Sequence, residues 1–256
     1  MKRRQEMLLR ELGLSPIFVR RDVRRAATAA SRAGANEPAA KDVSQPVSPA
    51  AGKDAPAAKA DRRERILKLD WSGLKAAVAD CTACSLHAGR TKTVFGVGDE
   101  RASWLFVGEG PGADEDLQGE PFVGQAGKLL DNMLAAINLK RGDDVYIANI
   151  VKCRPPRNRN PEPAEARSCE PYLARQIQLI KPRLIVALGK VAAQNLLDSD
   201  APVTSLRNKV FHYEGIPLIV TYHPAYLLRN LSDKAKAWED LCFIRENMRA
   251  LKSAAA

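Results

Sequence analysis

The sequence contains no apolar run that approaches the roughly 20 residues needed by a membrane-spanning helix. It also lacks the pattern of a secretory signal peptide. Charges interrupt the apolar residues of the basic start MKRRQEMLLRELG, and no small-residue cleavage site follows. These absences argue against a membrane protein and against export. We therefore expect a cytoplasmic protein with no membrane partner.

Residues 26–60 contain no aromatic residue and almost no large aliphatic residue. The segment is instead rich in Ala, Pro, Ser and Gly. Such a segment buries too little apolar surface to offset the entropy lost on ordering. We predict a disordered linker over 26–60, a separate basic and apolar peptide over 1–25, and one folded domain over 61–256. Residues 66–256 carry only +3 of the net charge of +10, so the high pI is weak evidence for nucleic-acid binding.

Four apolar runs in the domain have the length of buried parallel strands, and helical patterns alternate with them. The strands are predicted at 103–109, 145–153, 183–189 and 217–223, and the helices at 124–139, 161–180, 190–198 and 232–251. This alternation predicts an α/β sandwich. Ligands bind such sheets at the carboxyl ends of the strands. The ends of the first, second and fourth strands should therefore meet in one crevice.

A glycine-rich, acidic loop, FVGEGPGADEDLQGEPFVG at 106–124, follows the first predicted strand. The spacing of Gly108 and Gly110 formally fits a dinucleotide-binding turn. However, the next strand has no acidic end for a ribose, and Pro111 and three acids would crowd a pyrophosphate. A plain structural turn and a specialised pocket remain open, and we favour the pocket.

Four of the five cysteines fall into two pairs. Cys81 and Cys84 form a CxxC pair, whereas Cys153 and Cys169 are more widely spaced. Two separated pairs in a cytoplasmic chain predict four thiolate ligands for zinc or an iron–sulfur cluster, because a reducing compartment disfavours disulfides. The alternative is a chance set of buried cysteines. We expect Cys242 to be a core residue.

His223 is one of three histidines and ends the fourth predicted strand, immediately before the segment PAYLLR. A histidine at a strand end is more often structural than catalytic. Leu227 and Leu228 fit two alternatives. They form either the first turn of a helix that packs on the core, or an exposed apolar wedge that enters a base stack with Arg229 near a phosphate.

The motifs GEGPGADEDLQGEPFVGQAGKLLDNML, NIVKCRPPRNRNPEP and HPAYLLR, with the two cysteine pairs, resemble the family 4 uracil-DNA glycosylases of the iron–sulfur type. The resemblance runs from about residue 80 to residue 251. It implies a three-layer α/β/α sandwich with a four-stranded parallel sheet. It also implies a base-excision repair enzyme that flips uracil out of single- or double-stranded DNA and hydrolyses its N-glycosidic bond, leaving an abasic site. We expect a monomer.

The same resemblance implies roles for individual residues. The residues with catalytic roles are Glu109, Glu115 and His223. The residues that contact the base are Gly110 in the first active-site motif, Phe122 as the stacking ring and Asn149 as the reader of the uracil edge. The residues of the DNA-inserting loop are Pro224, Ala225, Leu227, Leu228 and Arg229. The ligands of a [4Fe-4S] cluster, with zinc as the alternative metal, are Cys81, Cys84, Cys153 and Cys169.

Two features differ from related families. In the best-known uracil glycosylase family, an aspartate activates water at the position that is Gly110 here. Glu109 or Glu115 would then position the water, and the sequence does not decide between them. A variant family that traps uracil covalently carries a histidine-containing insertion after the second strand. The segment CRPPRNRNPEP contains no histidine, so we expect ordinary turnover.

The peptide at 1–25 combines a charge of +5 with apolar residues that include Leu8, Leu12, Leu14 and Phe18. It fits either a basic arm that attracts DNA or a docking peptide for a protein partner. Its pattern resembles the N-terminal peptide of the psi subunit of the bacterial DNA polymerase III clamp loader, which binds the chi subunit. We favour docking to such a replication protein.

Two other functions remain open from the residues alone. One is a DNA-binding protein with a structural metal and no turnover, which would not need Glu109, Asn149 and His223 together. The other is a nucleotide-binding oxidoreductase that uses a cluster for electron transfer. It would require the ribose-binding acid that the second strand lacks.

Overall fold

The computed structural model describes residues 56–254, so the predicted peptide at 1–25 and most of the predicted linker lie outside the described residues. The first described element is helix α2 (Pro56–Leu67), which begins inside the segment predicted as linker. It packs against α6 (Pro163–Ile180). Arg62 donates to the carbonyl of Ser168. These contacts join α2 to the folded domain.

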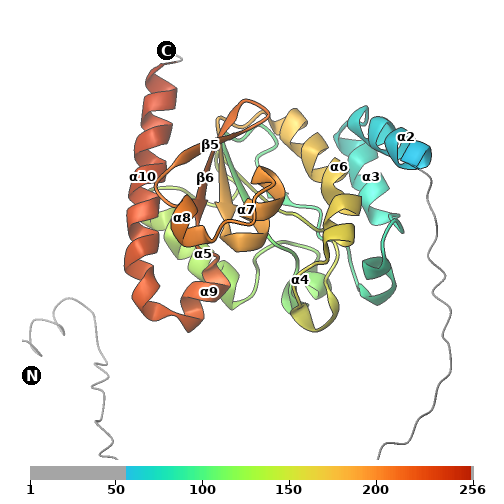
Figure 1. Cartoon of the computed structure of the whole chain (residues 1–256), viewed down its shortest axis with the longest axis horizontal. Coiled ribbons are helices and arrows are strands. Elements are labelled where there is room, and N and C mark those ends of the chain that lie inside the picture. Colours follow the sequence, from blue (N-terminus) through green and yellow to red (C-terminus); the bar gives the residue numbers. More distant parts are fainter. Residues whose placement is uncertain (1–55, 255–256) are drawn as a thin grey trace, which may run out of the picture. The chain divides into compact units, whose positions relative to one another are not determined.

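A sheet forms the centre of the domain, with helices on both sides of it (Figure 1). It has six strands in the order β1-β3-β2-β4-β6-β5. Its strands are β1 (Val97–Gly98), β2 (Trp104–Gly108), β3 (Val145–Asn149), β4 (Leu184–Leu188), β5 (Val210–Tyr213) and β6 (Ile216–Thr221). The four central strands, β3, β2, β4 and β6, are parallel, as predicted. The strands β1 and β5 add antiparallel edges. Both escaped prediction because β1 has two residues and β5 no continuous buried run.

Successive strand side chains enter two separate cores because they point to opposite faces of the sheet. In β2, Leu105 and Val107 belong to one core, and Trp104 and Phe106 to the other. The helices that cover the first face are α3 (Trp71–Ala79), α6 and α7 (Gly189–Leu197). Those that cover the second face are α5 (Gln125–Ala136), α9 (Pro224–Arg229) and α10 (Lys234–Ser253). The predicted three-layer α/β/α sandwich is confirmed.

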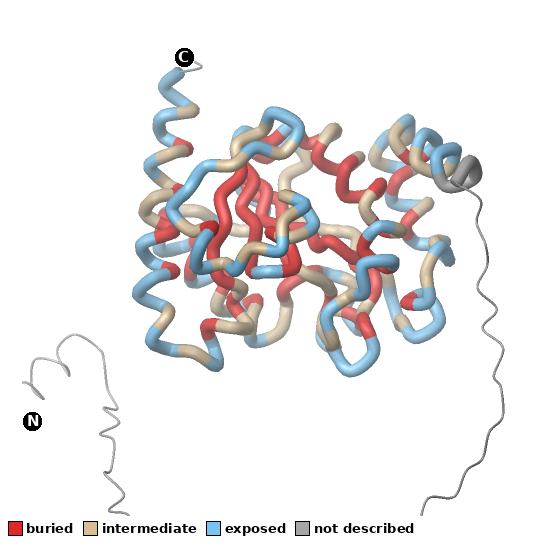
Figure 2. Tube along the Cα trace, viewed as in Figure 1, coloured by how far each residue is buried: buried red, intermediate tan, exposed pale blue. Residues whose placement is uncertain are grey.

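Burial is concentrated in the central strands, and the helices are exposed on their outer sides (Figure 2). The four predicted helices correspond to α5, α6, α7 and α10. The remaining short elements are α4 (Ala113–Gln118), α8 (Val203–Leu206), and the 3₁₀ helices η1 (Ser85–Gly89), η2 (Pro156–Asn158) and η3 (Leu231–Asp233). None of the helices between residues 56 and 254 is long and apolar enough to cross a membrane.

Candidate active site

A pocket of about 790 Å³ lies where the four parallel strands end. Each strand end contributes a lining residue: Glu109 follows β2, Asn149 ends β3, Gly189 follows β4 and His223 follows β6. The predicted crevice at the carboxyl ends of the strands is therefore present. The glycine loop after β2 forms a second wall of the pocket, so it is not a turn without a cavity.

Phe122 is held in this pocket by its backbone. Its φ of 55° lies in the left-handed region, which is unfavourable for a residue with a Cβ atom. Arg141 fixes this turn, because its Nη1 and Nη2 donate to the carbonyls of Pro121 and Phe122 at 2.7 Å each. Gly127 permits it, since a Cβ there would lie 1.8 Å from the Phe122 carbonyl oxygen. The ring is thereby set against the imidazole of His223, with 5.5 Å between centroids.

Glu115 holds the glycine loop together. Its Oε1 accepts from the backbone N–H groups of Val123 at 2.9 Å and Gly124 at 3.0 Å. Its Oε2 accepts from the N–H of Gly112 at 3.0 Å. A carboxylate with both oxygens occupied by main-chain donors organises the turn that carries Phe122. This geometry favours a positioning role for Glu115 over the direct catalytic role predicted from the resemblance.

Asn149 is 2% exposed, and its Oδ1 atom has no hydrogen-bond partner. Gly108 leaves the necessary space. A Cβ on Gly108 would lie 2.5 Å from Asn149 Oδ1 and 2.5 Å from Cζ of Phe122. Buried polar atoms are almost always paired, so an orphaned acceptor in a pocket indicates that a ligand completes it. Phe122 and Asn149 thus present an aromatic face and an amide beside each other.

His223 is neutral in the folded domain. Burial, followed by the charge of Arg229, lowers its pKa to about 4 despite the opposing charge of Glu115. Its Nδ1 accepts from the backbone N–H of Ala225 at 3.2 Å, so the proton of the neutral ring resides on Nε2. The ring therefore offers an N–H donor from Nε2 without carrying a positive charge.

Glu109 is an acid of the pocket, and burial raises its pKa to about 7. The next residue, Gly110, occupies the position of the water-activating aspartate in the best-known uracil glycosylase family. A Cβ at Gly110 would approach Cγ2 of Val151 to 2.7 Å, so a larger residue would displace that side chain. Water activation by an aspartate at this position is absent, and Glu109 remains as the acid at the end of β2.

The predicted DNA-inserting loop is helical. Residues Pro224–Arg229 form α9, with Pro224 at its first position, where the missing N–H costs nothing. Ala225 and Arg229 line the pocket. Leu227 is 1% exposed and belongs to the core between α9 and the sheet, so its assignment to an exposed wedge is wrong. Leu228 is 41% exposed, so the apolar surface of α9 that the sequence predicted is present at this residue.

The four paired cysteines line a second, small cavity. Three donors point at their sulfur atoms: Arg90 Nη1 lies 3.3 Å from Cys153 Sγ, the N–H of Lys152 3.3 Å from Cys169 Sγ, and Arg62 Nη2 3.8 Å from Cys81 Sγ. Burial raises the pKa of the Cys169 thiol to about 12, so a thiolate there needs a strong positive partner. Cys242 is partly buried, outside this set.

The donor set fits an iron–sulfur cluster by its chemistry, since four thiols and three N–H donors meet with no disulfide among them. Between residues 56 and 254, no group of three or more His, Cys, Asp or Glu side chains is arranged around a single-ion site. The cavity that the four cysteines line has a volume of about 10 Å³.

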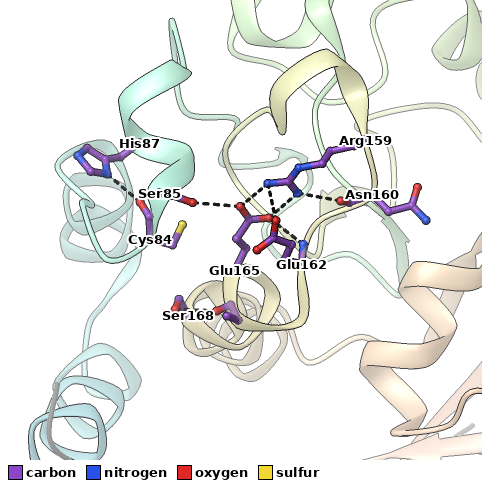
Figure 3. Close-up of polar contacts among 9 residues, drawn as sticks. Cys84, Ser85, His87, Arg159, Asn160, Glu162, Glu165 and Ser168 are labelled. Atoms are coloured by element: carbon purple, nitrogen blue, oxygen red, sulfur yellow. Dashed lines mark hydrogen bonds and ion pairs between the residues drawn. The ribbon is translucent and has the colours of Figure 1, made fainter. Parts of the chain in front are cut away.

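A buried carboxylate connects the cysteine segment to the pocket wall (Figure 3). Glu165 is 3% exposed and accepts from Arg159 Nη1 at 2.8 Å and Nη2 at 2.7 Å. It also accepts from the hydroxyl of Ser85 at 3.1 Å, directly after Cys84. Arg159 lines the large pocket. The network therefore ties the η1 segment to the loop after β3.

Two of the basic residues in KCRPPRNR have partners inside the protein. Arg159, whose side chain is 37% exposed, pairs with the buried Glu165, and Lys152 is 1% exposed. Lys152 is therefore out of reach of a DNA phosphate, whereas Arg154 and Arg159 are partly exposed and Arg157 is exposed. Sequence reasoning missed the positioning roles of Arg141, Arg159 and Glu165. The single local signal was the E-x-x-E spacing at the start of α6, where the Glu162 N–H donates to Glu165 Oε2 at 2.7 Å.

Comparison with known proteins gives the family. The model of the uracil DNA glycosylase superfamily matches residues 95–242. The type-4 uracil-DNA glycosylase of Archaeoglobus fulgidus is 50% identical over 159 residues, covering 59% of this chain and 79% of the relative. That of Thermotoga maritima is 44% identical over 176 residues, covering 68% and 89%. That of Sulfurisphaera tokodaii is 43% identical over 181 residues, covering 68% and 82%.

The residues matched by the family model include the pocket residues from Glu109 to Arg229 and the second cysteine pair, while Cys81 and Cys84 precede them. The resemblance found in the sequence is thereby confirmed, together with the fold that it implied. The chain belongs to the uracil DNA glycosylase superfamily and, within it, to the type-4 uracil-DNA glycosylases.

Proposed function

We propose that this protein receives a uracil nucleotide flipped out of DNA in its 790 Å³ pocket and hydrolyses the N-glycosidic bond there. The products are free uracil and an abasic site with an intact backbone. The observation that most supports this is the unpaired, buried Oδ1 of Asn149 beside the ring of Phe122. Together they form a slot for a flat base with a hydrogen-bonding edge.

Base selection follows from this slot. The Phe122 ring stacks on the face of uracil, while Asn149 Oδ1 accepts from the N3–H group and the amide NH₂ donates to the O4 carbonyl. Cytosine presents an unprotonated N3 and an amino group at the same positions. Both polar atoms of Asn149 would then be unpaired, and a site built to hydrogen-bond its substrate rejects such an analogue strongly.

Bond cleavage places opposite charges on the two fragments. As the C1′–N1 bond breaks, its electron pair leaves with uracil, and the sugar becomes oxocarbenium-like. The Nε2–H of neutral His223 donates to the developing oxyanion of the base. Ionised Glu109 stabilises the positive sugar and orients water. The water oxygen then bonds to C1′, and its released proton neutralises the uracil anion.

The cysteines Cys81, Cys84, Cys153 and Cys169 would hold a [4Fe-4S] cluster, with zinc as the alternative. Hydrolysis moves no electrons between substrate and protein, so the group supplies a covalent tie between the η1 segment and α6. This tie supports the loop after β3, whose residues Asn158 and Arg159 line the pocket. Iron and sulfide near four each per chain in the purified protein would separate the cluster from a single zinc.

The decisive experiment is incubation of excess protein with an oligonucleotide containing one uracil, followed by alkaline cleavage and by direct measurement of free uracil. We expect alkali-labile sites in U:G and single-stranded substrates and no nicking without alkali. Asn149→Asp serves as the matched variant, because a carboxylate cannot donate to O4 but accepts from the cytosine amino group. Absence of uracil release by the wild-type protein would overturn the proposal, and unchanged uracil rates in Asn149→Asp would overturn the role of Asn149.

A further inference from the structure

We infer that Lys152 is a positioning residue that sets the uracil-reading amide by holding the main chain of Asn149 from the cysteine-lined region. This inference rests on the proposed function of Asn149. Lys152 contacts neither the base nor the sugar, and it does not line the pocket. Its side chain instead donates from Nζ to the carbonyl oxygen of Asn149 at 3.0 Å.

Lys152 is anchored at every polar group that it carries. Nζ also donates to Oε1 of Gln176 in α6 at 2.6 Å. The backbone N–H donates to Cys169 Sγ at 3.3 Å, and the backbone carbonyl accepts from Val94 at 2.8 Å. One residue therefore joins a cysteine sulfur to the carbonyl of the base reader.

The Asn149 carbonyl needs such a donor because β3 ends at this residue. Beyond the strand, Ile150 donates to the Gly108 carbonyl at 3.0 Å and Val151 to the Glu109 carbonyl at 3.2 Å. These bonds hold the chain on the β2 side. Lys152 holds it on the opposite side, toward α6, so the Asn149 peptide is fixed from both directions.

Burying the amine of a lysine costs free energy that an apolar side chain at the same position would not. Lys152 is 1% exposed, and its two side-chain partners in the described residues are neutral oxygens. Burying an amine is unfavourable unless its N–H groups are hydrogen-bonded, so the two bonds from Nζ offset part of this cost. Gln176 is itself fixed, because its Nε2 donates to the Phe95 carbonyl at 2.9 Å. Lys152 thus provides a hydrogen-bond donor that is held in one direction, toward the Asn149 carbonyl.

The test compares Lys152→Met with the wild-type protein, using iron-loaded full-length chains with equal iron content. The first readout is inhibition by free uracil, which reports the base slot. The second is affinity for abasic-site DNA, which reports the rest of the surface. We expect a roughly tenfold rise in the uracil inhibition constant, equivalent to one misplaced hydrogen bond, and unchanged abasic-DNA affinity. Lys68→Met, at an exposed lysine directly after α2, is the matched control and should change neither.

A double-mutant cycle decides whether Lys152 acts through Asn149. Added to Asn149→Ala, Lys152→Met should raise the inhibition constant less than twofold further, because the amide to be positioned is gone. If Lys152→Met loses iron or unfolds, Gln176→Leu takes its place, since it removes one anchor and keeps the contact to Cys169. We expect a roughly threefold rise from it.

Full additivity in the cycle, or an equal loss of abasic-DNA affinity, would overturn the inference. So would an unchanged inhibition constant in whichever variant is folded and loaded. If Asn149→Ala itself leaves uracil inhibition unchanged, the proposed base reader fails. If Asn149→Ala raises the constant and Lys152→Met does not, only the role of Lys152 fails.

Discussion

Around the cysteines, the buried polar side chains are paired: Glu165 accepts from Arg159 and Ser85, and Lys152 donates to Gln176. In the large pocket, the Oδ1 of Asn149 has no partner, and burial raises the pKa of Glu109 to about 7 without a partner that lowers it. Paired groups stabilise one structure, whereas unpaired groups keep their hydrogen-bonding capacity for a substrate. The comparison thus separates a region that supports the fold from a region that performs chemistry.

The largest effect on excision is expected from removing the side chain that donates a hydrogen bond to the departing base. His223→Ala deletes the Nε2–H donor for the departing base. Loss of one such donor lowers kcat by about 10²–10³-fold. Single-turnover excision of uracil measures the change. His212→Ala, at an exposed histidine of β5, is the control and should retain full activity. A loss of less than about threefold in His223→Ala would remove this residue from the mechanism.

The next effect is expected from the cysteine region and should act first on stability. Cys153→Ala removes one of four thiols and, with it, the arginine-bonded sulfur that faces Arg90. We expect loss of iron, a Tm lower by several degrees and weaker DNA binding, since each kcal/mol corresponds to about 2–4 °C in a domain of this size. Iron analysis and thermal melts measure the first two.

Cys242→Ala is the matched variant, because this thiol lies outside the cysteine-lined cavity. It should keep its iron. Intact iron content and unchanged melting in Cys153→Ala would show that Cys153 is not a ligand, and the contrast between the two regions would then lose its basis.

A smaller effect on excision is expected from Glu115, a pocket residue whose carboxylate is already hydrogen-bonded. Glu115→Gln keeps the size of the side chain but offers one oxygen to three backbone donors, the N–H groups of Gly112, Val123 and Gly124. Phe122 should lose its fixed position, and excision should slow by about tenfold, as expected for one or two lost charge-assisted hydrogen bonds. Glu120→Gln, at an exposed acid of the same loop, is the control. A pH-rate profile of unchanged shape would show that Glu115 positions the loop and does not titrate in the reaction.

The sequence was sufficient for the parts of the molecule that repeat a local pattern. The four parallel strands follow from continuous apolar runs such as residues 103–109. The crevice follows from the rule that strand ends converge. Phe122, Asn149 and His223 came from the family motifs, and the structure brings them together in the pocket.

The remainder depends on contacts between distant segments, which no local pattern encodes. Arg141, in the segment between α5 and β3, bonds to the carbonyl of Phe122, and Glu165 bonds to Ser85 across 80 residues of sequence. Leu227 and Leu228 look alike in sequence, and only the helical turn of α9 shows that one faces the core. The short edge strand β1 likewise depends on its pairing with β3.

A modest effect is expected from pH, and it distinguishes Glu109 from His223. Because burial raises the pKa of Glu109 to about 7, its ionised form increases as the pH rises through 7, and excision should increase with it. His223, with a pKa of about 4, should add no inflection near its ordinary value of 6.5. Glu109→Gln should abolish the inflection near 7. An inflection that survives this substitution would assign it to another group.

The same two groups affect stability with opposite signs. Between about pH 4 and 6.5, the unfolded chain binds a proton at His223 that the folded domain does not, so the folded state loses stability as the pH falls through this window. Between 4.5 and about 7, the folded domain keeps a proton on Glu109 that the unfolded chain has released, so stability falls as the pH rises. Comparing pH-dependent melts of the wild type, His223→Ala and Glu109→Gln separates the two contributions.

The smallest effect on excision is expected from deleting residues 1–55, which keeps α2 and therefore its contact with α6. All residues of the pocket and all four paired cysteines lie beyond the deletion. Activity on short oligonucleotides should remain within about twofold, whereas association with a partner should be lost.

If the segment is a basic arm, the lost contribution to DNA binding should weaken steeply with salt, because its charge acts through counterion release. If it is a docking peptide, binding to the purified chi subunit should survive moderate salt and disappear in Leu12→Ala with Phe18→Ala, since apolar anchors in a groove carry such contacts. We favour docking because a basic arm binds DNA through its charge and would not need so many leucines. Failure of residues 1–25 to retain the chi subunit, together with a salt-sensitive loss of DNA affinity on deletion, would support the basic arm instead.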